Sequence, residues 1–108
     1  MSRKALGEFE HLILLSILRL GEKAYGAKII EEVEGRTGRS VNQAAAYLTL
    51  RRLEEKGWVT SALGAPTPER GGRAKRFFRL LPEGEGRLRD SRADLLSMWE
   101  GIAAELEG

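Results

Sequence analysis

The stretch from Glu69 to Arg79, ERGGRAKRFFR, carries the side chains with the clearest chemistry in the sequence. Five of its eleven residues are basic, and only one acidic residue opposes them. A glycine pair, Gly71 and Gly72, precedes most of the cations, and glycine lets a turn close without a side chain in the way. Cations beside such a turn are suited to neutralising phosphates. The alternative is a solvated hairpin tip whose cations serve only solubility. The basic residues are Arg70, Arg73, Lys75, Arg76 and Arg79.

Residue combinations that could support catalysis are weak by comparison. His11 is the only histidine, and its place in an apolar run favours a helix-surface or interface position. Asp90 and Asp94 are four residues apart, but neighbouring arginines favour an ion-pair face over a metal site. The glycine-rich patch lacks the Lys-Ser/Thr pair of a nucleotide-binding loop. Because the chain has no cysteine, it has no disulfide and no thiolate metal site. We expect no enzymatic activity, no cofactor and no metal.

Composition and charge indicate an ordinary globular domain with two unlike ends. The chain has 108 residues, of which 42% are apolar and 31% charged, which suffices for one hydrophobic core. Residues 1–80 carry a net charge of +6 and residues 81–108 a net charge of −4. No apolar run is typical of a secretory signal or long enough to span a bilayer. We therefore expect a cytoplasmic protein with no membrane contact.

Apolar periodicity and glycine positions predict a mainly α fold with one small β-hairpin. The first helix is apolar on more than one side, so one chain covers it with difficulty. Ser40 and Gln43 have the spacing of a capping box at the start of the third helix. On that helix Ala46, Leu50 and Leu53 share a face and should point to the core. The expected elements are helices over 6–20, 24–38, 40–57 and 82–106 and strands over 58–63 and 73–80.

Three helices followed by a basic hairpin is the order of a winged helix-turn-helix, which binds double-stranded DNA. We expect residues 1–80 to form this DNA-binding domain and residues 81–108 a C-terminal dimerisation helix. Tyr47 lies at the edge of the core face of the third helix; it either contacts a phosphate with its hydroxyl or is simply a half-buried core tyrosine. The expected DNA-binding residues are Asn42, Gln43, Ala44, Tyr47, Leu48, Arg51, Arg70, Gly71, Gly72, Arg73 and Lys75.

Apolar residues of the final helix recur at the alternating four- and three-residue spacing of a heptad seam, with Arg92 filling one gap. Such a seam predicts a homodimer that also uses the over-apolar first helix. The alternative is that the final helix folds back on its own domain. The expected interface residues are Phe9, Leu12, Leu88, Leu95, Trp99, Ile102 and Leu106.

The sequence also resembles the PadR-like transcriptional regulators over most of its length. The resemblance lies in LGEFEHLILLSILRLGEKAYGAKI, AAAYLTLRRLEEKGWV and PTPERGGRAKRFFRLLPEGE. It implies a homodimeric DNA-binding regulator, most often a repressor, of the subfamily with one C-terminal helix. Two positions depart from the family pattern: Leu81 stands where Thr or Ser is usual, and Leu48 where a polar residue or proline is usual. A winged-helix module that binds proteins and has no operator is the alternative function.

A small aromatic effector is a further expectation. Trp99 lies in the predicted seam, near its symmetry mate in a two-fold dimer. Two rings across a helical interface can leave a slot for a planar apolar molecule. The resemblance adds weight, because some PadR-like regulators respond to aromatic compounds. The alternative is a Trp99 that anchors the dimer with no cavity beside it.

Overall fold

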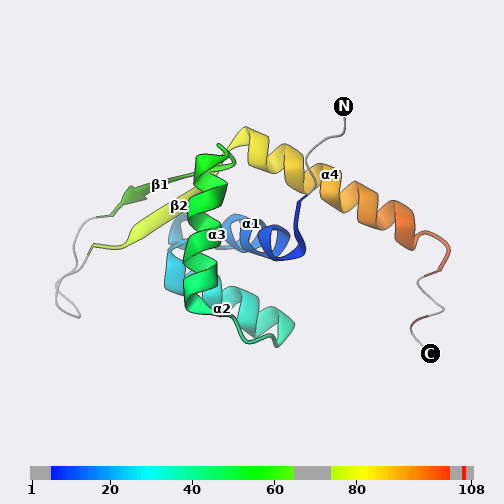
Figure 1. The fold of residues 1–108 in the computed structure, drawn as a ribbon, viewed down its shortest axis with the longest axis horizontal. Coiled ribbons are helices and arrows are strands. Elements are labelled where there is room, and N and C mark those ends of the chain that lie inside the picture. The colour runs from blue at the N-terminus through cyan, green and yellow to red at the C-terminus, as the bar shows by residue number, and fades with distance from the viewer. Residues whose placement is uncertain (1–5, 65–73, 103–105, 107–108) are drawn as a thin grey trace.

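The computed structural model describes residues 6–64, 74–102 and 106. It confirms a mainly α fold with one small β-hairpin, in the order expected from the sequence (Figure 1). A single 3₁₀ turn, η1, joins the first two helices. The elements are α1 (Glu8–Leu20), η1 (Gly21–Lys23), α2 (Gly26–Thr37), α3 (Gln43–Glu55), β1 (Val59–Leu63), β2 (Arg76–Leu80) and α4 (Pro82–Trp99).

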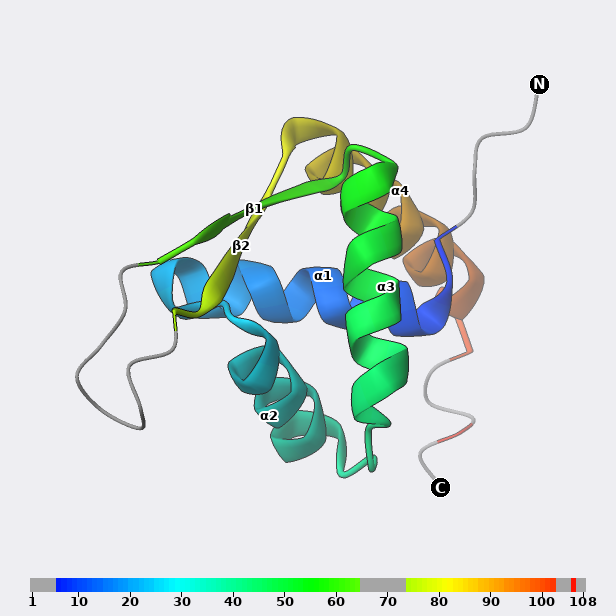
Figure 2. The same cartoon turned by 60° about the vertical axis from the view of Figure 1, so that its left-hand side comes forward.

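The core lies where α1, α2 and α3 meet beneath the hairpin. Figure 2 shows α3 crossing α1 steeply, with α2 on the side away from the hairpin. Ala46, Leu50 and Leu53 of α3 are fully or almost fully buried, as predicted. Trp58 is the largest of the fully buried side chains. The core cluster contains Ile13, Leu14, Ile17, Ala24, Ile29, Val33, Leu50, Leu53, Trp58, Val59, Phe78 and Leu88.

The start of α3 differs from the predicted capping box. Its N-cap is Asn42, whose side-chain oxygen accepts a hydrogen bond of 2.8 Å from the Ala45 N–H. Ser40 lies two residues before this position and is exposed. The capping box of Ser40 and Gln43 is therefore wrong, because the N-cap is Asn42, two residues after the position that the motif requires.

The hairpin is tied to the helical body by its second strand. β1 and β2 pair antiparallel, with Val59 opposite Leu80 and Leu63 opposite Arg76. The Phe78 N–H donates to the Ala24 carbonyl at 2.8 Å, and Tyr25 forms an isolated bridge with Phe77. The segment just before α2 thus acts as a short third partner of the hairpin and fixes its direction.

α4 begins against the body and then leaves it. Leu81 is the N-cap and makes no side-chain capping bond, but its N–H donates to the Trp58 carbonyl at 2.9 Å. Gly84 and Leu88 are buried, whereas every residue of α4 after Ser91 is exposed. The hairpin and α4 leave the body in opposite directions (Figure 1).

The predicted end of the final helix at Leu106 is wrong. The helix stops at Trp99, because Glu100 takes an extended backbone (ψ 126°) and Gly101 a left-handed one (φ 84°). Ile102 therefore follows the helix, and the predicted heptad seam is continuous only as far as Trp99. Within the described residues, no helix combines the length and the apolar character needed to span a membrane.

Candidate nucleic-acid interface

The outward face of α3 presents the side chains that the sequence assigns to base recognition. Gln43, Ala44, Leu48 and Arg51 are exposed, and the exposed fraction of Leu48 is 51%. Because their inward neighbours on α3 are buried, the helix is held rigidly against the core with this face outward. Asn42 uses its side-chain oxygen as the helix cap, which leaves its two amide N–H groups as donors.

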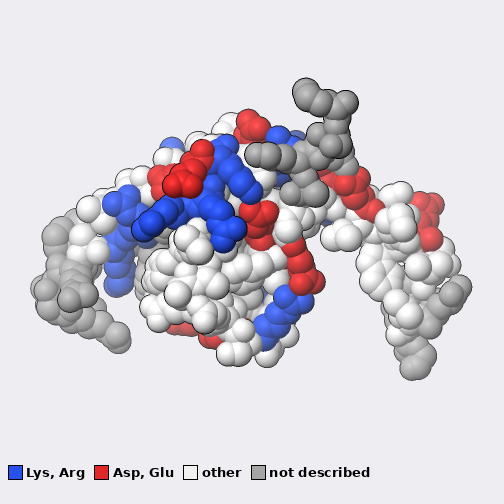
Figure 3. Space-filling model, viewed as in Figure 1, with Lys and Arg blue, Asp and Glu red and all other residues white. Residues whose placement is uncertain are grey.

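Charge is distributed unevenly along α3. Its first half carries no charged residue, whereas the second half and the C-cap carry Arg51, Arg52 and Lys56 together with Glu54 and Glu55. In Figure 3 blue and red side chains lie together over this end of α3, blue side chains continue along the hairpin, and the other end of the helix is white. An uncharged tip with flanking cations suits a helix whose start meets base edges and whose end meets phosphates.

Trp58 fixes the C-terminal end of α3. The Lys56 ammonium lies 4.6 Å from the centroid of the Trp58 ring, and the Arg87 guanidinium of α4 lies 5.3 Å from it. Such cation–π contacts link three elements at one buried ring. Lys56 is accordingly oriented by the body of the protein.

The same lysine is paired with α1. The Lys56 ammonium donates to the Glu10 carboxylate at 2.9 Å. Burial alone would raise the pKa of Glu10, but hydrogen bonds from the Gly7 N–H and from Lys56 hold it below its usual value. Glu10 is therefore an ionised partner at neutral pH, and part of the positive charge at this end of α3 is neutralised.

A short chain of polar contacts joins the end of α3 to both strands of the hairpin. The Glu54 carboxylate accepts from the Ser61 hydroxyl at 2.9 Å and from the Ser61 N–H at 3.1 Å. Arg76 of β2 donates to the same hydroxyl at 3.0 Å. These contacts set the angle between the hairpin and α3.

Lys75, at the base of the basic wing, is held against an aromatic pair. Its ammonium lies 4.8 Å from the centroid of the Tyr25 ring. Tyr25 also packs edge-on against Phe77, with centroids 5.5 Å apart. Since Lys75 is exposed, its charge remains available to a phosphate. Four other predicted wing residues, Arg70, Gly71, Gly72 and Arg73, lie outside the described residues.

Tyr47 lies at the edge of the core face, as the sequence predicted: its ring packs on α2, and 42% of its surface is exposed. Its partner is Gly26, the first residue of α2, which sequence reasoning missed. Tyr25 and Arg76 were also not assigned a role. The dipeptide Tyr25-Gly26 at a helix start was the available signal, because a glycine there often marks a close approach of another chain segment.

The predicted dimer residues occupy two different environments. Phe9 and Leu12 are partly buried on the core, and Leu88, with an exposed fraction of 7%, belongs to the core of its own chain. Exposed apolar residues instead cluster near the end of α4 and just after it, where no described residue covers them. They are Leu95, Leu96, Met98, Trp99, Ile102 and Leu106.

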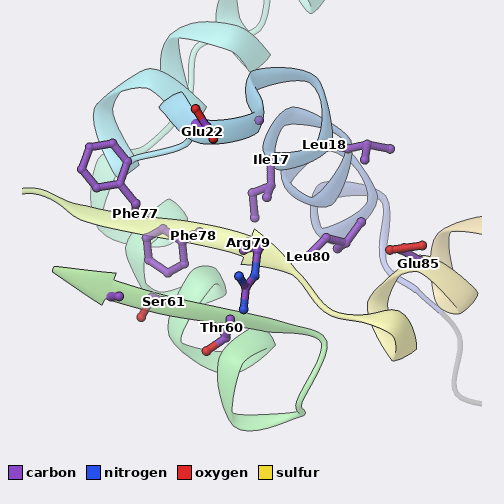
Figure 4. Close-up of a pocket in the computed structure, with 12 residues that line it drawn as sticks. Ile17, Leu18, Glu22, Thr60, Ser61, Phe77, Phe78, Arg79, Leu80 and Glu85 are labelled. Atoms are coloured by element: carbon purple, nitrogen blue, oxygen red, sulfur yellow. The ribbon is translucent and has the colours of Figure 1, made fainter. Parts of the chain in front are cut away.

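An open, mainly apolar groove of about 620 Å³ separates the end of α1 from the outer side of the hairpin. Its lining residues include Ile17 and Leu18 of α1 and Phe78 and Leu80 of β2 (Figure 4). Trp99, the expected effector-binding residue, does not line it. Among the described residues, no group of three or more potential metal ligands comes together.

The comparisons with known proteins agree with this geometry. The model of the PadR-like family of transcriptional regulators matches residues 14–90. The chain belongs to this family. Its members are transcriptional regulators, and the fold described above is a DNA-binding winged helix-turn-helix. No curated protein sequence matches the chain significantly.

Solved structures share the fold over most of the chain. A PadR-family regulator of Clostridium difficile R20291 is 22% identical, with a TM-score of 0.68 over 89% of this chain and 98% of its own. A PadR-family regulator of Eggerthella lenta is 26% identical, with a TM-score of 0.66 over 89% and 81%. A complex structure of hsRosR-S4 is 30% identical, with a TM-score of 0.65 over 94% and 81%.

Proposed function

We propose that this PadR-like regulator is a repressor that binds a pseudo-palindromic operator as a homodimer. The observation that carries the proposal is the outward face of α3, which is uncharged at its start, carries Arg51 and Arg52 towards its end and is flanked by the basic hairpin. A winged helix-turn-helix places such a helix in the major groove. A repressor acts by occupying its operator, and this action needs no catalytic group.

The contacts divide by chemistry into two classes. Gln43, Ala44 and Leu48 lie on the uncharged part of α3 and would face base edges, where hydrogen bonds and methyl contacts discriminate sequence. Tyr47, Arg51 and Lys75 would contact phosphates, which fixes register without reading sequence. Wing residues 70–73 would extend the phosphate contacts, and Asn42 would add amide donors at the start of α3.

The end of α4 supports the homodimer. The exposed fractions of Leu95 and Trp99 are 53% and 44%, and neither is covered by described parts of its own chain. Large exposed apolar side chains gathered in one place are typical of an interaction surface. A second copy pairing there would hold two recognition helices at a fixed separation. Phe9 and Leu12 of α1, and Ile102 and Leu106 after α4, would complete the interface.

An effector would act through the same interface. Trp99 is the last residue of α4, and its ring would lie near the ring of its symmetry mate. A planar aromatic compound held between the two rings changes DNA affinity only if it prefers one spacing of the recognition helices.

Selection of duplexes from a random pool, followed by sedimentation of the complex, tests the proposal. We expect an enriched inverted repeat with half-site centres about 34–36 Å apart and two chains per duplex. An isolated half-site bound by a single chain would contradict the homodimer. A pool without any enriched sequence would favour the protein-binding alternative.

A further inference from the structure

Gly26 is buried under Tyr47, the one aromatic side chain on the outward part of α3. A Cβ atom placed on Gly26 would lie 2.6 Å from the Tyr47 hydroxyl oxygen and 2.8 Å from the ring carbon that carries it, and would also overlap a ring edge carbon. Favourable contacts to carbon lie near 3.5–4.0 Å. The ring therefore occupies space that exists only because residue 26 has no side chain.

Space is the only requirement for glycine at this position. The backbone of Gly26 is not left-handed, unlike that of Gly21, Gly38, Gly57 and Gly101. Alanine would fit the backbone of α2 and would raise its helix propensity. Any cost of Gly26→Ala therefore arises at Tyr47.

Tyr25, the residue before Gly26, positions a side chain of the wing in the same way. Tyr25 holds the Lys75 ammonium over its ring and packs edge-on against Phe77. Two consecutive residues at the start of α2 thus touch the two elements that meet DNA. Tyr25 faces the hairpin, and Gly26 faces α3.

We infer that Gly26 is a positioning residue for DNA binding, because it sets where the Tyr47 hydroxyl meets the phosphate backbone. The inference rests on the proposed DNA contact of Tyr47. An added methyl group would displace that hydroxyl by roughly 1 Å, judged from ordinary contact distances. A hydrogen bond of about 2.7 Å stretched by that amount is lost.

The fold tolerates this displacement. The overlapping atoms are the far end of a flexible side chain that is partly exposed, so the ring can swing outward while α2 and α3 stay in place. Folding and DNA binding are thereby separated in one variant, since alanine at position 26 would move the hydroxyl and leave the core packed.

A double-mutant cycle on the full chain tests the inference, with a selected operator duplex as the probe. Gly26→Ala should weaken binding about tenfold or more, the effect of losing one hydrogen bond to a charged group. In a Tyr47→Ala background the same change should have no further effect. Gly35→Ala is the matched control, because it lies on the same helix and an added Cβ there would meet nothing within 4 Å. It should leave affinity unchanged.

Each contrary result has a distinct meaning. If the wild type binds its operator and Gly26→Ala binds as tightly as Gly35→Ala, the positioning role is wrong and the proposed function stands. Additive losses from Gly26→Ala and Tyr47→Ala would also overturn the positioning role. A melting temperature far below that of Gly35→Ala would show that Gly26 serves folding, which also overturns the inference. If the wild type selects no duplex at all, the proposed function itself fails.

Discussion

Replacing Gly84 by alanine should destabilise the protein by about 1–3 kcal/mol, the usual cost of overfilling a packed site. A Cβ on Gly84 would collide with the carbonyl oxygen of Trp58 and lie 2.9 Å from a methyl carbon of Leu80. The first obstacle is backbone, so no side-chain rotation relieves it. The contact joins α4 to the body of the domain.

The expected loss of stability in Gly84→Ala is the net result of opposing effects. Pushing α4 outward would stretch the 2.9 Å hydrogen bond from the Leu81 N–H to the Trp58 carbonyl, which is worth about 1 kcal/mol. Alanine would return about 1 kcal/mol through its better helix propensity. The two nearly cancel, so the steric overlap decides the sign and most of the size.

Gly86→Ala supplies the control, since an added Cβ there would meet nothing within 4 Å. It should be neutral or stabilise the protein by up to about 1 kcal/mol. Thermal unfolding of both variants, at one protein concentration because a dimer would make melting concentration-dependent, measures the difference. Equal melting temperatures for Gly84→Ala and Gly86→Ala would refute the packing of α4 on Trp58.

Three further substitutions test the wing, the contact between α1 and α4, and the end of α4. Lys75→Ala should flatten the slope of log DNA affinity against log salt by about 0.9, whereas Arg89→Ala on α4 should leave it unchanged; equal slopes would contradict the wing assignment. Burial lowers the pKa of His11, whose ring nitrogen lies 2.9 Å from the Ser91 hydroxyl of α4. The neutral imidazole therefore stabilises the folded state above the unfolded pKa of about 6.5, and this stability is lost as the pH falls through the lower pKa of the folded state. Urea unfolding should therefore show a smaller acid-induced loss for His11→Gln than for the wild type, and identical losses would count against this role. Leu95→Glu should raise the dimer dissociation constant at least about tenfold, since it buries an unpaired charge, while Leu63→Glu on the exposed side of the hairpin should not; unchanged sedimentation of the first variant would exclude this surface as the interface.

The order of elements could be predicted from the sequence because the spacing of apolar residues and the glycines that end helices are local signals. Gly21 and Gly57 end α1 and α3 as expected, since both adopt backbone conformations that other residues avoid. The inward face of α3 followed from helical periodicity for the same reason. The winged helix-turn-helix then followed from element order.

Features that depend on tertiary contact could not be predicted. Ser40 and Asn42 are both good caps, and the packing of the preceding loop decides which one begins α3. The roles of Gly26 and Gly84 depend on what lies opposite them, which no local pattern reveals. Leu88 fits a heptad seam in sequence, yet the angle at which α4 leaves the body buries it in its own core.

The central claim is that the outward face of α3 reads DNA sequence. Its most direct test is the ratio of affinities for the selected operator and a scrambled duplex, measured at one salt concentration. For the wild type we expect a ratio of about a thousandfold or more. A Gln43→Ala, Leu48→Ala double variant should lose at least about tenfold in this ratio while binding the scrambled duplex as before. A wild-type ratio near one, or an unchanged ratio in the folded double variant, would contradict the claim.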